Sequence, residues 1–307
     1  MTSLRVSTSQ IFNRPASQMA SLTKQSTLLQ TQISTGKQFT KASENVVGWT
    51  QVQTLDRADA NSTADASNIK MAQSLLTQSD SVLDSIQTQL QQAQELATNA
   101  ASGTLNDTDR AAIAQQIDSI LTDVLALANT KDVRGAPLFG GATGDTAYTQ
   151  AADGSVSFTG SGTPASIPIG DGVNIQATES GDKIFGTVAT ASGTSDVFAM
   201  LSQLSAALKA GGSAAQDAAS SAIDDLDAAL DQIGTTRASL GARNARLDLE
   251  ASRLTDAAAA RDETRTAVQG TDTTQAVADL QQTLTILSAT QASFTKLTSL
   301  SLFDYLK

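Results

Sequence analysis

The sequence predicts a mainly α-helical protein, an elongated helical bundle or coiled coil with a small β-rich domain inserted in its middle. Three observations predict this class. Aromatic residues make up only 4% of the 307 residues, which suits thin helical rods better than a thick globule. Twelve of the 20 glycines and three of the four prolines lie between Arg134 and Gly193. Both flanks of that stretch carry apolar residues at helical spacing.

Three helices are predicted in the first flank. Asn13 and Pro15 resemble a helix start, and Gly36 ends that helix. A second helix begins near Glu44, and a third is capped by Asn106 or Asp107. The second helix repeats apolar residues at strict intervals of seven, which is typical of a coiled-coil seam: Ile69, Leu76, Leu83, Leu90 and Ala97.

Strands are predicted in the middle of the chain and helices in the second flank. Apolar alternations at 155–158, 167–169 and 173–175, bounded by glycine turns, predict a β-rich domain from about 135 to 190. A short helix follows Asp196, and from Ile223 to residue 268 a heptad rhythm continues without a slip. Four of its seam positions are polar, which lowers stability but fixes register and neighbours: Arg237, Asn244, Arg261 and Arg265. The last helix follows Gly270.

The glycines and prolines that interrupt the helical patterns divide the chain into five expected segments. They are an N-terminal assembly helix (1–45), two halves of a helical rod (46–134 and 194–269), a β-rich variable outer domain (135–193) and a C-terminal assembly helix (270–307). The two ends need partners, because an apolar seam or tail left exposed is a liability in a monomer. We therefore predict an assembly interface at Ile11, Phe12, Leu22, Leu29, Ile33, Leu287, Phe294, Leu297, Leu302, Phe303 and Leu306.

Composition excludes most enzyme chemistry. The chain has no cysteine and no histidine, which removes thiolate nucleophiles, histidine bases and the usual zinc ligands. No enzyme activity, cofactor or metal site is therefore expected. Aspartates beside glycine are assigned to turn capping rather than calcium: Asp145, Asp153, Asp171 and Asp182. A run on the second long helix is assigned to a solvated face rather than to paired catalytic carboxylates: Asp224, Asp225, Asp227 and Asp231.

The formal net charge of −11 argues against nucleic acid or an anionic membrane as the main partner. Residues 1–57 hold six bases and two acids, net +4, so residues 58–307 carry −15. The basic end and the acidic remainder either attract each other between subunits or form ordinary solvated faces, and both interpretations stay open. The same holds for Arg243 and Arg246, which either pair with other groups or lie on a solvated face.

Neither a cleavable signal peptide nor a membrane span is expected.

Several segments resemble the flagellin superfamily. Gln32–Lys37 followed by Ala42–Asn45 is similar to the link between the first two helices of that family. Leu90–Ala97 and Leu127–Thr130 resemble its next blocks, and the second leads into Gly135–Gly141, which is similar to the entry into its variable domain. The resemblance covers about 1–145 and 195–307 with gaps.

The ends distinguish between branches of that family. Arg5–Phe12 and Leu300–Leu306 resemble the members that join the flagellar hook to the filament, whereas flagellins usually end in a different leucine-rich motif. The resemblance implies unfolded export through the flagellar type III apparatus with the help of an export chaperone. It also implies an extracellular ring of copies of this chain, next to other hook-associated proteins and flagellin subunits. The alternative is a flagellin or a surface-displayed homologue, acting as filament subunit or as adhesin or glycan binder.

Overall fold

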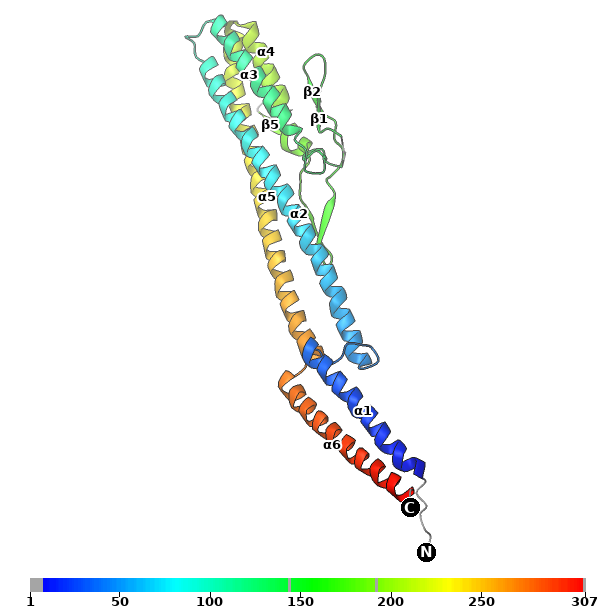
Figure 1. Ribbon diagram of the computed structural model, residues 1–307. Coiled ribbons are helices and arrows are strands. Elements are labelled where there is room, and N and C mark those ends of the chain that lie inside the picture. Colours follow the sequence, from blue (N-terminus) through cyan, green and yellow to red (C-terminus); the bar gives the residue numbers. More distant parts are fainter. Residues whose placement is uncertain (1–7, 143–144, 191–192, 306–307) are drawn as a thin grey trace. The chain divides into compact units, whose positions relative to one another are not determined.

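The computed structural model describes residues 8–142, 145–190 and 193–305 (Figure 1). Its contacts divide the chain into two compact units, one of residues 1–60 with 257–307 and one of residues 61–256. Helices dominate, and three small strand pairs lie in the glycine-rich stretch, which confirms the predicted class. The predicted division into five functional segments stays a prediction.

The first unit holds two terminal helices and the adjoining ends of two long ones. α1 (Thr8–Thr35) and α6 (Thr273–Tyr305) lie side by side, drawn in blue and red in Figure 1. The unit also includes the beginning of α2 (Val46–Ala100) and the end of α5 (Gly212–Gln269). Gly36 has a φ of 67°, a conformation that suits glycine, and it ends α1 as predicted.

The predicted start of the first helix is wrong. α1 begins at Thr8 rather than near Asn13, so Pro15 lies inside the helix. A proline in a helix interior costs about 3 kcal/mol, because it removes one backbone donor and crowds the preceding turn. Contact between α1 and α6 offsets this cost, and Pro15 lines a shallow cleft together with Ile286 and Phe294 of α6. The local signal of a proline near a helix start was overridden by tertiary contact.

The second unit is a helical bundle with strands. It contains α3 (Asp107–Ala128) and α4 (Val197–Ala210), which pack on each other, together with the larger parts of α2 and α5. The side chain of Asn106 accepts a hydrogen bond from the backbone N–H of Asp109, and Asp196 accepts one from Ala199. Both predicted helix starts are thus confirmed.

α3 is long and apolar enough to cross a membrane by length and composition alone, which the sequence analysis did not anticipate. Its apolar face is instead buried in the second unit, through Ala114, Ile117, Ile120, Leu121, Val124 and Ala128. Its Asp118 accepts hydrogen bonds from Ser205 and Lys209 of α4. A helix buried on one face and paired through a carboxylate is behaving as the core helix of a bundle.

The glycine-rich stretch forms three separate antiparallel pairs. They are β1 (Tyr148–Gln150) with β2 (Val156–Phe158), β3 (Ser166–Gly170) with β4 (Val173–Gln176), and β5 (Val188–Thr190) with β6 (Gly193–Ser195). The three predicted alternations all lie in strands, within β2, β3 and β4. The last pair extends beyond the predicted limit near residue 190.

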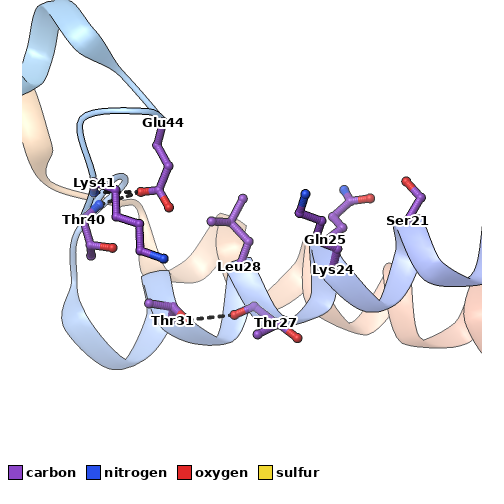
Figure 2. A pocket seen from close by; sticks show the side chains of 9 residues that line it. All are labelled: Ser21, Lys24, Gln25, Thr27, Leu28, Thr31, Thr40, Lys41 and Glu44. Carbon is purple, nitrogen blue, oxygen red and sulfur yellow. Dashed lines mark hydrogen bonds between the residues drawn. The ribbon is translucent and has the colours of Figure 1, made fainter.

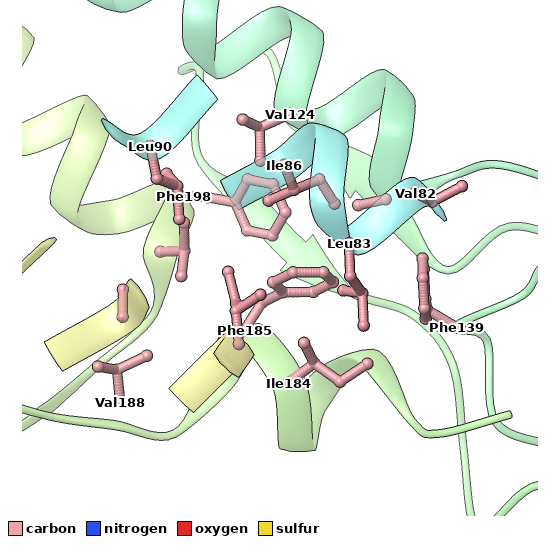
Figure 3. Packing of buried hydrophobic residues seen from close by; sticks show 14 of the residues in the cluster. Val82, Leu83, Ile86, Leu90, Val124, Phe139, Ile184, Phe185, Val188 and Phe198 are labelled. Carbon is pink, nitrogen blue, oxygen red and sulfur yellow. The ribbon is translucent and has the colours of Figure 1, made fainter. Parts of the chain in front are cut away.

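An aromatic cluster connects the strand region to the helices of the same unit. Phe185 lies at its centre, with ring centroids 5.8 Å from Phe139, 6.1 Å from Tyr148 and 6.1 Å from Phe198. Figure 3 shows these phenylalanines beside Leu83, Ile86 and Leu90, part of the apolar face of α2. Burial raises the pKa of Tyr148, whose hydroxyl has no hydrogen-bond partner. The core of this unit therefore spans both strands and helices.

The polar seam residues of α5 in this unit behave in two ways. Arg237 pairs with Asp80 at 2.9 Å and with Asp84 at 2.8 Å on α2. The side-chain oxygen of Asn244, in contrast, is buried without a partner. The pairs made by Arg237 disfavour a shifted register between the two helices, whereas the unpartnered oxygen of Asn244 costs stability in the observed register.

The heptad prediction for α5 is wrong at one point. Ala258 is exposed, and Ala257 is half-buried in its place. The predicted row continues beyond this point, because Arg261 and Arg265 are half-buried again. The departure is therefore confined to one turn of α5.

The sequence left open whether Arg243 and Arg246 form pairs or lie on a solvated face, and the structure shows a partner for Arg243. The guanidinium of Arg243 donates to Glu179 at 2.6 Å and to the backbone carbonyl of Gln176 at 3.1 Å. Arg246 is exposed. Pairing within the chain therefore accounts for Arg243.

Candidate assembly surface

Five predicted interface residues have side chains within the described part of the structure. On α1, Leu29 is 8% exposed, and Leu22 and Ile33 are half-buried. On α6, Leu287 and Phe294 are half-buried. These residues lie on the two helices that pack side by side, and their role in assembly stays a prediction.

The remaining predicted residues lie outside the described side chains. Five of them fall within the bounds of α1 and α6, and Leu306 lies beyond the described residues altogether. The five are Ile11, Phe12, Leu297, Leu302 and Phe303.

The α1–α6 pair leaves apolar side chains in contact with solvent. Leu28 is 41% exposed on α1, and Val277, Leu284 and Ile286 are 40%, 41% and 42% exposed on α6. Val277 and Leu284 are seven residues apart, so they lie on one face of the helix. Val277 and Leu284 belong to the apolar pattern of the last helix but were left out of the predicted interface, and Leu28 and Ile286 were not predicted. Leu28 beside Leu29, and Ile286 beside Leu287, were the signal that apolar residues extend beyond a single seam.

The loop between α1 and α2 is tied to the link between α5 and α6. The backbone N–H of Gln38 donates to the carbonyl of Gln269 at 2.7 Å, and that of Thr271 donates to the carbonyl of Gly36 at 3.0 Å. The buried side chain of Gln269 donates to the carbonyl of Phe39 at 2.8 Å. These bonds hold the bases of the two terminal helices together.

Phe39 anchors the same loop in a site that requires glycine. Its ring is 2% exposed, and a Cβ atom at Gly48 would lie 2.7 Å from the tip of the ring. Real Cβ atoms essentially never approach so closely, so the ring would have to move. The Phe39 ring therefore packs directly against the backbone of Gly48 at the start of α2.

We expect Gly48→Ala to destabilise the first unit by about 1–3 kcal/mol, since overpacking a buried site outweighs the better helix propensity of alanine. Urea unfolding followed by the fluorescence of Trp49, the one tryptophan of the chain, reports on this unit. Gly234→Ala is the matched control, because Gly234 lies in α5 with nothing within 4 Å of its would-be Cβ. That control should gain about 0.5–1 kcal/mol by circular dichroism. Equal gains for both variants would refute the packing argument.

Two aspartates of α2 and two arginines of α5 form a charged cluster in the same unit. Asp59 accepts hydrogen bonds from Arg265 and from Arg261, the latter at 2.6 Å, and Asp56 pairs with Arg265 at 3.0 Å. The hydrogen bond from Arg265, then that from Arg261, lowers the pKa of Asp59. The hydrogen bond with Asp59 in turn raises the pKa of Arg265. Two polar seam positions thus connect α5 to α2 by charge.

This cluster gives the first unit an acid-sensitive contribution to stability. Because the folded-state pKa of Asp59 is depressed, its contribution is complete above the unfolded pKa of about 4 and is lost as pH falls through the lower folded-state value. We expect Asp59→Asn to remove part of the acid dependence measured by Trp49 fluorescence, and to destabilise the unit at neutral pH. Identical acid titrations of the variant and the parent protein would contradict this assignment.

An open groove lies between α1 and the loop that follows it (Figure 2). Leu28 rises from α1 between Lys24 on one side and Lys41 with Glu44 on the other. The carboxylate of Glu44 accepts hydrogen bonds from the backbone N–H groups of Thr40 at 2.7 Å and Lys41 at 3.2 Å. The bond from Thr40 is the main cause that lowers the pKa of Glu44. The carboxylate is therefore committed to shaping the loop.

The carboxylates of the chain form no compact ligand set in the described residues. No group of three or more acidic side chains in that part is arranged to hold a metal ion. In the α5 run, Asp224, Asp227 and Asp231 are exposed, while burial, followed by the charge of Asp224, raises the pKa of the half-buried Asp225. Among the glycine-adjacent aspartates, Asp153 caps a turn by accepting from the backbone and hydroxyl of Ser155.

Comparison with known proteins shows what the first part of the chain is similar to. The family model of the bacterial flagellin N-terminal helical region matches residues 6–143, which include α1, α2 and α3. The resemblance to the flagellin superfamily is thereby confirmed.

Two curated relatives with significant sequence similarity share one name, flagellar hook-associated protein 3. The flagellar hook-associated protein 3 of Escherichia coli (strain K12) is 30% identical over 190 residues, covering 58% of each chain. The protein of the same name from Salmonella typhimurium is 31% identical over 138 residues, which cover 45% of this chain and 44% of that relative. The aligned regions thus span less than two thirds of either relative.

A solved structure shares the fold. The crystal structure of FlgL from Xanthomonas campestris superimposes with a TM-score of 0.62, over 69% of this chain and 99% of that one, at 19% identity. At that level of identity the likeness concerns the fold alone. It is consistent with the mainly helical architecture and its small strand pairs.

Proposed function

We propose that this chain is a structural component of the bacterial flagellum, a hook-filament junction protein that assembles through its terminal helices. The observation that carries the proposal is the α1–α6 pair, which exposes four large apolar side chains although its two helices already pack on each other. Apolar surface of this kind is stabilised when a neighbouring molecule covers it. The name of the curated relatives, flagellar hook-associated protein 3, supports a place in the flagellum beside the hook.

The proposed partners follow from this role. Copies of this chain form a ring, with other hook-associated proteins and flagellin subunits as neighbours above and below it. The protein reaches the outside of the cell through the flagellar export apparatus with the help of an export chaperone. Burial of the exposed side chains by neighbours offsets the conformational entropy lost on assembly.

Immunogold electron microscopy of isolated flagella tests this proposal. An antibody to the chain should label one site per flagellum, where the hook meets the filament. Label along the whole filament would instead favour a flagellin, and label on the cell surface away from flagella would favour an adhesin. Either of those patterns would overturn the junction role.

A further inference from the structure

The groove beside α1 is built to receive something that the chain itself does not supply. It has a volume of about 660 Å³ and is open to solvent along its length. Leu28 projects into it, at 41% exposure, with Lys24 and Lys41 at its borders (Figure 2). The groove therefore combines an apolar centre with a positive rim, a pattern found at protein interfaces.

The rim of this groove carries an excess of positive charge. Among the described residues, Lys24 and Lys41 make no side-chain ion pair within 4 Å. The carboxylate of Glu44 feels the charge of Lys41 and also accepts from two backbone N–H groups, so one acidic group stands against two lysines. The whole segment 1–57 carries a net charge of +4, while residues 58–307 carry −15. An occupant of the groove should therefore bear carboxylates, and this chain is rich in them.

One surface of the chain offers exposed carboxylates in a row. Asp224, Asp227 and Asp231 are exposed and lie three and four residues apart on α5, so they form one acidic stripe. No ion pair joins them to a base among the described residues. The stripe runs over seven helical steps, about 10 Å, and the stretch of α1 from Lys24 to Thr31 that lines the groove has the same length.

We propose that the groove docks the acidic stripe of a second copy of this chain, which rests on the proposed assembly into a ring. The two surfaces differ, so the contact joins copies head to tail. A head-to-tail contact produces a ring when its rotation closes. Leu28 gains burial in this contact, while the lysines set the position of the incoming helix through charge.

Disulfide trapping tests the contact directly, because the natural chain has no cysteine. One tagged copy carries Leu28→Cys and a second, differently tagged copy carries Asp227→Cys, both expressed in cells that lack the parent gene. Flagella isolated from these cells should yield a disulfide-linked heterodimer after mild oxidation. Two cysteines form a disulfide only when their Cα atoms lie within about 7 Å.

The matched control replaces Asp227→Cys with Leu249→Cys, which lies on the same helix and is 66% exposed. This pair should give no heterodimer above background. Equal yields from both pairs, or no heterodimer from either, would overturn the proposed contact. If the protein is present in flagella but no heterodimer forms, the junction role survives and this contact does not. If the protein is absent from flagella, the proposed function itself fails.

Charge exchange supplies an independent readout. The double substitution Lys24→Glu with Lys41→Glu should reduce the amount of protein retained in isolated flagella, and Asp224→Lys with Asp227→Lys should do the same. Combining all four substitutions in one chain should restore retention, because the signs are complementary again. Loss without restoration would show that the lysines meet another protein rather than the acidic stripe, and no loss in either variant would equally refute the contact.

Discussion

Leu29→Asp should abolish incorporation of the protein into flagella while leaving the second unit folded. Among the predicted interface residues of α1 whose burial the structure describes, Leu29 is the most buried, and α1 packs along α6. A carboxylate placed there loses the apolar contacts of leucine and must be buried or force the helices apart, at a cost of at least about 3 kcal/mol. Protein in isolated flagella and swimming in soft agar both measure the outcome.

Gln30→Asp is the control for that substitution, since it adds the same charge at the neighbouring exposed position of α1. It should incorporate and swim normally. Circular dichroism should show that the second unit of Leu29→Asp still unfolds cooperatively, since Leu29 lies outside residues 61–256. Normal incorporation of Leu29→Asp would show that pairing of the terminal helices is dispensable for assembly.

Phe185→Ala is expected to destabilise the second unit by about 3–5 kcal/mol. The ring is fully buried and touches three other rings from the strand region and α4, so its loss leaves a cavity that rigid neighbours cannot fill. Urea unfolding followed by far-ultraviolet circular dichroism measures the change. The fluorescence of Trp49, in the first unit, should shift much less.

Val133→Ala is the control for the aromatic cluster, because Val133 is 93% exposed. Its effect should stay within about 0.5 kcal/mol. A loss below about 1 kcal/mol for Phe185→Ala would mean that the strand region is not part of the core of this unit.

Local signals in the sequence were sufficient for much of the fold. Asn106 and Asp196 cap helices where predicted, and Gly36 ends α1, because caps and left-handed glycines depend on neighbours along the chain. The alternating residues of the middle also form strands as predicted. Pro15 misled the prediction because its cost is offset by α6, a partner more than 250 positions away in sequence.

The candidate surface was predictable only in outline. Periodicity identified Leu29 and Leu287 as seam residues, and Leu28 beside Leu29 indicated further apolar surface, but nothing in the sequence indicated that Leu28 would line a groove. That groove depends on the path of the loop after α1, which is set by the seating of Phe39 on Gly48 and by bonds to Gln269. Such contacts join residues distant in sequence, so no repeat or motif announces them.

The junction role is tested most directly by electron microscopy of cells that lack this gene, with a blot of the culture medium for flagellin. The account predicts intact hooks without filaments, and flagellin lost to the medium. Normal filaments on the deleted strain, with no flagellin shed, would contradict it.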